Sequence, residues 1–81
     1  MNAYDITFTA LGVQRSALVR GRENASRVFN LVCAAATPNH GRSELKYVRA
    51  WAKHAPIGTT FSAASSPNDA NVYRVTIRRV Q

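Results

Sequence analysis

The stretch AYDITFTA at residues 3–10, followed by Leu11-Gly12, decides how the chain begins to fold. From Tyr4 onward every second side chain is apolar, which is the pattern of a β-strand that turns one face to a core. The side chains expected on that face are those of Tyr4, Ile6, Phe8 and Ala10. Because Gly12 accepts the positive φ of a tight hairpin turn, residues 13–20 are expected to return as a second strand.

This second predicted strand has apolar side chains on both of its faces. Val13, Ala17 and Val19 share one face with Arg15, whereas Leu18 shares the other face with polar residues. A strand between two neighbours usually has one cleanly apolar face, so the mixed pattern is typical of a strand at the edge of a sheet.

Two helices are expected in the middle of the chain. Gly21 interrupts the strand pattern, and from about Glu23 the apolar residues recur with the period of an α-helix. The predicted apolar stripe consists of Ala25, Val28, Phe29, Val32 and Ala36, with Arg27, Asn30 and Ala34 on the back of the helix. Residues 37–41 have the composition of a loop, and Ser43 is the expected N-cap of a second helix that Pro56 ends.

In the second predicted helix, an apolar arc lies beside a basic stripe. The arc consists of Leu45, Tyr47, Val48, Trp51, Ala52 and Ala55, and the stripe consists of Lys46, Arg49 and Lys53. A helix with this pattern packs its apolar arc against another layer and leaves its cations in water, where they can meet a partner.

Two further strands are expected after the second helix. Residues 59–63 have the pattern of a short strand, and residues 65–71 form a polar loop. In the last segment Tyr73, Val75 and Ile77 point inward and alternate with Arg74, Thr76 and Arg78, and Arg79 follows close by. Residues 1–81 are therefore predicted to form a single α+β domain of order ββααββ. In this two-layer sandwich, two helices cover one face of an antiparallel sheet and leave the other face in water.

The composition limits the function further. With 81 residues, 46% of them hydrophobic, the chain can form one core but has little room for a deep ligand pocket. Eleven Lys and Arg against four Asp and Glu give a net charge of +7, which predicts an anionic partner such as nucleic acid or an acidic protein face, and no membrane. The single cysteine and the lack of a long apolar run predict a cytoplasmic protein.

A catalytic or metal site is not expected. The candidate side chains are Cys33, His40, His54, Asp5 and Asp69, and their spacing matches neither a catalytic triad nor a zinc site. Cys33 falls on the flank of the first helix stripe, which indicates a buried and inert thiol. The four glycines are scattered singly, so no phosphate-binding loop is predicted either. The sequence predicts binding without catalysis and without a cofactor.

Two groups of cations are the predicted binding residues. The strand row consists of Arg74 and Arg78, with Arg79 close by, and the helix stripe consists of Lys46, Arg49 and Lys53. Either group could instead be a solvated surface that keeps the domain soluble, an alternative that weighs more for the helix than for the strand. Stacking on bases is poorly supported, because only Tyr47 and Trp51 among the aromatic residues fit partly exposed positions.

The organisation of the chain resembles that of small accessory proteins of bacteriophages and mobile elements. The features that carry this resemblance are the strand Tyr4-Asp5-Ile6-Thr7-Phe8-Thr9, a glycine turn, a second strand and a helix that opens with Glu23-Asn24-Ala25. Among these proteins the chain is similar in size and organisation to anti-CRISPR inhibitors. The resemblance implies a non-catalytic protein in a bacterial host cell that docks on a defence complex, and the charge of +7 excludes mimicry of DNA.

Three functions are compatible with these observations. The first is an inhibitor that docks on a host nucleoprotein complex, through an acidic protein patch or its bound nucleic acid. The second is a DNA- or RNA-binding module that uses the same cations on phosphates. The third is a structural homodimer that pairs through the exposed edge strand, so either a monomer or a homodimer is expected.

Overall fold

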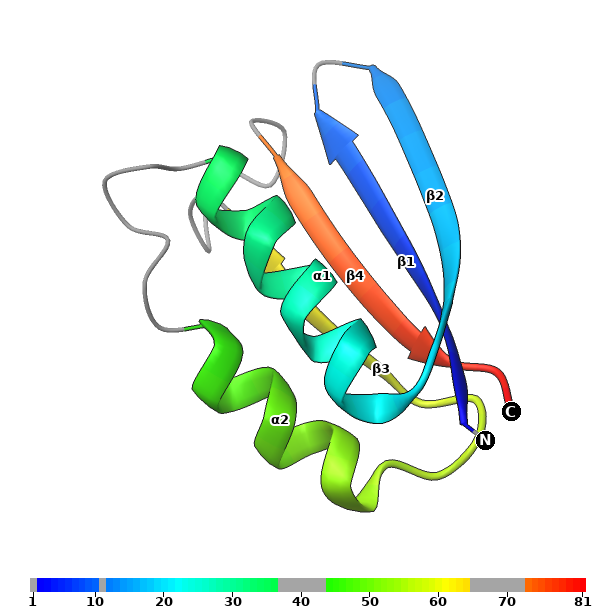
Figure 1. Ribbon diagram of the computed structural model, residues 1–81. Helices are drawn as coiled ribbons and strands as arrows, with labels where there is room; N and C mark the ends of the chain where they lie inside the picture. The colour runs from blue at the N-terminus through cyan, green and yellow to red at the C-terminus, as the bar shows by residue number, and fades with distance from the viewer. Residues whose placement is uncertain (1, 11, 37–43, 65–72) are drawn as a thin grey trace.

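The computed structural model describes residues 2–10, 12–36, 44–64 and 73–81, and these form the predicted α+β architecture. The elements are β1 (Ala3–Ala10), β2 (Val13–Arg20), α1 (Arg22–Ala36), α2 (Glu44–His54), β3 (Thr60–Ala64) and β4 (Arg74–Arg79). The strands make one antiparallel sheet in the order β2-β1-β4-β3. Both helices lie on the same face of this sheet (Figure 1).

The hairpin of β1 and β2 has the predicted form. Ala10 pairs with Val13 next to the turn, and the ladder continues without interruption to the pair Ala3 and Arg20. Gly12 has a φ of +79°, a conformation that costs a residue with a Cβ atom but is open to glycine. Among the described strands, β2 lies at one end of the sheet order, which confirms the prediction of an edge strand.

The last strand lies in the middle of the sheet, between β1 and β3. Val75 and Ile77 of β4 are fully buried, because α1 covers this part of the sheet. The two ends of the chain run side by side, and the amide of Val80 donates a hydrogen bond of 2.9 Å to the carbonyl of Ala3 (Figure 1). The pairing of the first strand with the last therefore closes the fold.

The buried face of α1 differs from the predicted stripe. Ala25, Phe29 and Cys33 are buried, whereas Val28 and Val32 are only half-buried. Asn30, which was expected on the back of the helix, accepts a hydrogen bond of 3.0 Å at its Oδ1 atom from the amide of Leu45. The reason is that α1 contacts α2 as well as the sheet, so its covered surface is rotated and wider than one stripe.

The inner face of α2 agrees with the prediction except at Tyr47. Val48 and Ala52 are buried, but Tyr47 is 54% exposed. Trp51 is half-buried, and its ring meets that of Tyr4 edge-on at a centroid distance of 6.0 Å. The predicted N-cap, Ser43, lies outside the described residues.

Within the described ranges, neither helix combines the length and apolar character needed to cross a membrane.

Candidate functional site

The face of the sheet turned away from the helices, here named the open sheet face, collects most of the polar side chains of the four strands. Alternation along each strand and the pairing between strands define its members. They are Gln14, Ser16, Leu18 and Arg20 of β2, Asp5, Thr7 and Thr9 of β1, Arg74, Thr76 and Arg78 of β4, and Thr60, Ser62 and Ala64 of β3. All of these side chains are exposed or half-buried, whereas Ala3, which lies opposite Arg20 on the same face, is buried.

A row of hydroxyl groups crosses the middle of the open sheet face, with one hydroxyl from each strand. Thr7 lies opposite Ser16 on one side and opposite Thr76 on the other, and Thr76 lies opposite Ser62. The hydroxyl oxygens of Ser62 and Thr76 are 3.0 Å apart and share a hydrogen bond. Each hydroxyl can donate as well as accept, so this hydroxyl row is a line of potential contacts to the oxygens of a ligand.

Arginine side chains flank the hydroxyl row on both sides. Arg74 and Arg78 stand two positions before and two positions after Thr76, about 13 Å apart along β4 at roughly 3.3 Å per residue. Arg20 stands at the corner of the same face, at the end of β2, and its side chain reaches Gln81 at 3.5 Å.

Among the described residues, no acid forms an ion pair with the arginines of the open sheet face. Asp5 lies directly opposite Arg78 in the pairing of β1 with β4, yet no ion pair within 4.0 Å joins them. Within the described ranges, the ion pairs that form are those of Glu23 with Arg27 and with Arg49, both on the helix layer. The guanidinium groups of Arg74 and Arg78 are therefore available to an external anion.

Arg79 does not belong to the open sheet face, although the sequence analysis grouped it with Arg74 and Arg78. By alternation it shares the inner face with Val75 and Ile77, and it is half-buried. Its three guanidinium nitrogens donate to the carbonyl of Ala55, the Oδ1 atom of Asn2 and the carbonyl of Gln81. A cation held by three internal acceptors supports the fold.

The predicted helix stripe lies on the opposite layer of the molecule. Lys46, Arg49 and Lys53 are exposed on α2, which packs against α1 and β3 and lies on the far side of the sheet from the open sheet face (Figure 1). Arg49 also pairs with Glu23 of α1. The structure therefore brings Arg74 and Arg78 together on one face but does not bring the helix stripe to them.

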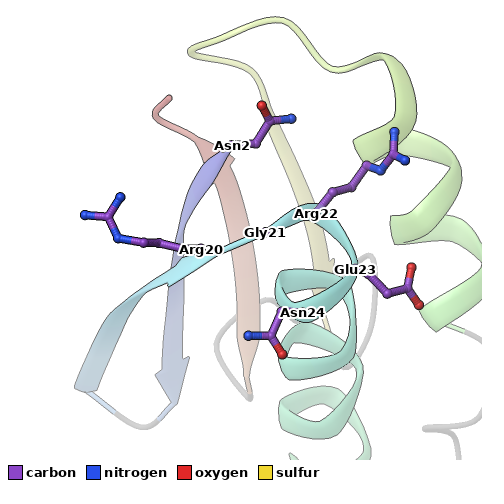
Figure 2. Close-up of a pocket in the computed structure, with 6 residues that line it drawn as sticks. All are labelled: Asn2, Arg20, Gly21, Arg22, Glu23 and Asn24. Atoms are coloured by element: carbon purple, nitrogen blue, oxygen red, sulfur yellow. The ribbon is translucent and has the colours of Figure 1, made fainter.

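A hollow at the start of α1 also contains cations. Figure 2 shows it, and it is lined by Asn2, Arg20, Gly21, Arg22, Glu23 and Asn24. The side chains of Arg20 and Arg22 point in different directions from the ribbon, and Glu23 adds a carboxylate beside them (Figure 2). Because these charged groups diverge, the hollow lacks the convergent geometry of a binding site.

The candidate catalytic side chains that the structure describes lie apart from one another. Cys33 is buried in the core at 1% exposure, His54 is exposed at the end of α2, and Asp5 is on the open sheet face. His40 and Asp69 lie outside the described residues. Among the described residues, no three His, Cys, Asp or Glu side chains are grouped so that they could hold a metal ion.

The hydroxyl row is the feature that sequence reasoning missed. Alternation along β1 and β4 places Thr7, Thr9 and Thr76 on the outer face, but it does not connect Ser16 and Ser62 with them. The two-residue turn fixes the pairing of β1 with β2, so the position of Ser16 beside Thr7 could have been found. The position of Ser62 requires the pairing of β3 with β4, which no local signal specifies.

Comparisons with protein-family models, with curated proteins and with solved structures each found no match for this chain.

Proposed function

We propose that the protein is a non-catalytic binding module that contacts the phosphate backbone of nucleic acid through the open sheet face. The hydroxyl row flanked by Arg74 and Arg78 is the observation that carries this proposal. Arginine, serine and threonine are among the side chains that contact phosphate oxygens in protein–DNA complexes, and arginine can pair with a phosphate through two parallel hydrogen bonds. The open sheet face offers both kinds of donor on one surface.

The aromatic side chains favour duplex over single-stranded nucleic acid. Proteins that bind single strands without sequence preference usually stack bases on exposed aromatic rings. The described strands place their aromatic residues Tyr4, Phe8 and Phe61 on the inner face, so the open sheet face offers no ring for stacking. Contact with the backbone of a duplex requires only cations and hydroxyls, which this face supplies.

The proposal is tested by fluorescence anisotropy with a labelled duplex of random sequence at low salt. The double variant Arg74→Ala/Arg78→Ala should bind roughly tenfold more weakly or worse, because two charge-assisted contacts are lost. The matched control is Lys46→Ala/Lys53→Ala, which removes the same charge from exposed positions on α2 and should change the affinity far less. No binding by the natural sequence, or an equal loss in both double variants, would contradict the proposal.

A second candidate function is an inhibitor that docks on a host nucleoprotein complex in the bacterial cytoplasm. The observation that favours it is Leu18, an apolar side chain that is 57% exposed on the mostly polar open sheet face. A protein partner would cover this side chain, whereas a phosphate backbone would leave it in water. Such a protein could act on the complex and its bound nucleic acid at the same time.

The two candidates differ in how they depend on Leu18. If the partner is a protein, Leu18→Ser should reduce its recovery in affinity purification from a bacterial host while leaving the affinity for free duplex unchanged. The Arg74→Ala/Arg78→Ala variant should reduce both. Recovery of the same proteins with natural and variant chains would count against the inhibitor.

A further inference from the structure

The outer edge of β2 is a free strand edge among the described residues. β2 is eight residues long, its pairing with β1 contains no bulge, and seven of its eight residues are exposed. It contains no proline, and its charged residues are Arg15 and Arg20. Proteins usually protect edge strands by making them short, by bulges, by proline, by charged side chains or by a covering segment. Of the protections that its own sequence can supply, β2 has only charge, and two arginines repel a basic strand but not an acidic one.

An apolar groove follows this edge on the helix side of the sheet. It has a volume of about 140 Å³, and it is lined by Ile6, Phe8, Arg15, Ser16, Ala17, Val28 and Val32. The groove exists because α1 lies over β1 and β4 and leaves the inner face of β2 largely uncovered (Figure 1). Val28 and Val32 are therefore only half-buried, and Leu31 on the same helix is 66% exposed. Apolar surface beside a free edge is the surface that an added strand would cover.

The charges at this edge define the chemistry of the occupant. Arg15 lies at the groove on the inner face and Arg20 on the open sheet face, and β2 has no acidic residue. We propose that the edge takes up an extended segment of a partner protein as a fifth strand, one that alternates apolar and acidic side chains. Its backbone pairs with β2 and its apolar side chains fill the groove, so alternation places its carboxylates on the open sheet face, beside Arg20.

A second copy of the chain fits this edge less well than an acidic segment. Pairing two β2 strands would gather four guanidinium groups, from Arg15 and Arg20 of each copy, with no carboxylate supplied by either strand. The net charge of +7 on each chain would add to the repulsion. Charge complementarity therefore favours a different, acidic partner.

Hydrogen exchange of the backbone amides tests this proposal with a defined probe. The probe is a capped octapeptide of alternating Val and Glu, compared with the matching peptide of alternating Val and Lys. With the Glu peptide, the outward amides of β2 should exchange roughly tenfold more slowly, because they donate to the added strand. The Lys peptide should give little protection, since its ammonium groups would lie beside Arg20 on a chain of net charge +7.

Two variants separate binding at the edge from general effects of charge. Ala17→Glu places a carboxylate at the groove and should abolish the protection of the β2 amides by the Glu peptide. Thr60→Glu adds the same charge at the opposite edge of the sheet and should preserve this protection. Should Ala17→Glu fail to fold, Arg15→Glu serves the same purpose. Equal protection by both peptides, or no protection of β2, would overturn the proposal. A dimer whose β2 amides are already protected without peptide would overturn it in favour of a second copy.

Discussion

The Nη1 atom of Arg79 donates a hydrogen bond of 2.7 Å to the backbone carbonyl of Ala55. The same guanidinium reaches Asn2 at 3.1 Å and the carbonyl of Gln81 at 3.0 Å. Arg79 therefore joins three segments that are distant in sequence: the start of β1, the residue after α2 and the end of the chain. A planar group with five donors suits this role, because it can serve several acceptors without moving.

Replacing Arg79 should destabilise the fold. Arg79→Ala is expected to lower the free energy of unfolding by about 1.5–3 kcal/mol, since it leaves a part-buried carbonyl without its charged donor. Arg79→Lys should recover only part of the lost stability, because a single ammonium group cannot donate to all three acceptors as the planar guanidinium does. Its neighbour provides the control: Arg78→Ala on the open sheet face should change stability by less than about 0.5 kcal/mol. Urea unfolding followed by circular dichroism measures all three, and equal effects of the Arg79 and Arg78 variants would refute the assignment.

The side chain of Asn30 should stabilise the start of α2. Its Oδ1 atom accepts from the amide of Leu45, one of the first-turn amides that lack a partner within their own helix. Asn30→Ala should cost about 1 kcal/mol of stability, a typical effect for the loss of a helix cap. Asn24→Ala, at an exposed position in the first turn of α1, serves as the comparison in the same urea titration. A larger effect at Asn24 than at Asn30 would contradict this role.

The ion pairs of Glu23 should contribute little to stability. Glu23 meets Arg49 and Arg27, but the side chains of Glu23 and Arg49 are 53% and 45% exposed, so water and salt screen them. Glu23→Gln is expected to reduce the free energy of unfolding by about 1 kcal/mol or less at low salt. The difference should shrink further at high salt. A loss that is large and independent of salt would show that the contact between α1 and α2 depends on this pair.

The thiol of Cys33 should react only when the protein unfolds. Cys33 is 1% exposed within the core cluster, so a thiol reagent cannot reach it in the native state. Labelling with Ellman's reagent in increasing urea should follow the unfolding transition that circular dichroism records. Rapid labelling of the native protein would mean that α1 opens locally without global unfolding.

The element order and the layer arrangement were predictable from the sequence, because local patterns specify them. Alternation at Tyr4, Ile6 and Phe8 marked β1, the glycine at position 12 marked the hairpin, and the mixed faces of residues 13–20 marked an edge strand. The change from a period of two to the helical period after Gly21 separated the strands from α1. The expected third strand was displaced by one residue from the observed Thr60–Ala64.

The site was only partly predictable, because it depends on which strands become neighbours. Arg74 and Arg78 were placed correctly by alternation within one strand. The hydroxyl row requires β4 to lie between β1 and β3, and this order arises from tertiary packing and not from any local pattern. The wider buried surface of α1 was missed for a similar reason, since it depends on the contact with α2 that engages Asn30.

The salt dependence of duplex binding tests the central claim most directly. If Arg74 and Arg78 each neutralise a phosphate, removing both should reduce the slope of log affinity against log salt concentration by about 1.8, or about 0.9 per phosphate. The control variant Lys46→Ala/Lys53→Ala should keep the slope of the natural sequence. An unchanged slope for Arg74→Ala/Arg78→Ala, or a reduction of the same size in the control, would show that the open sheet face is not where the protein meets nucleic acid.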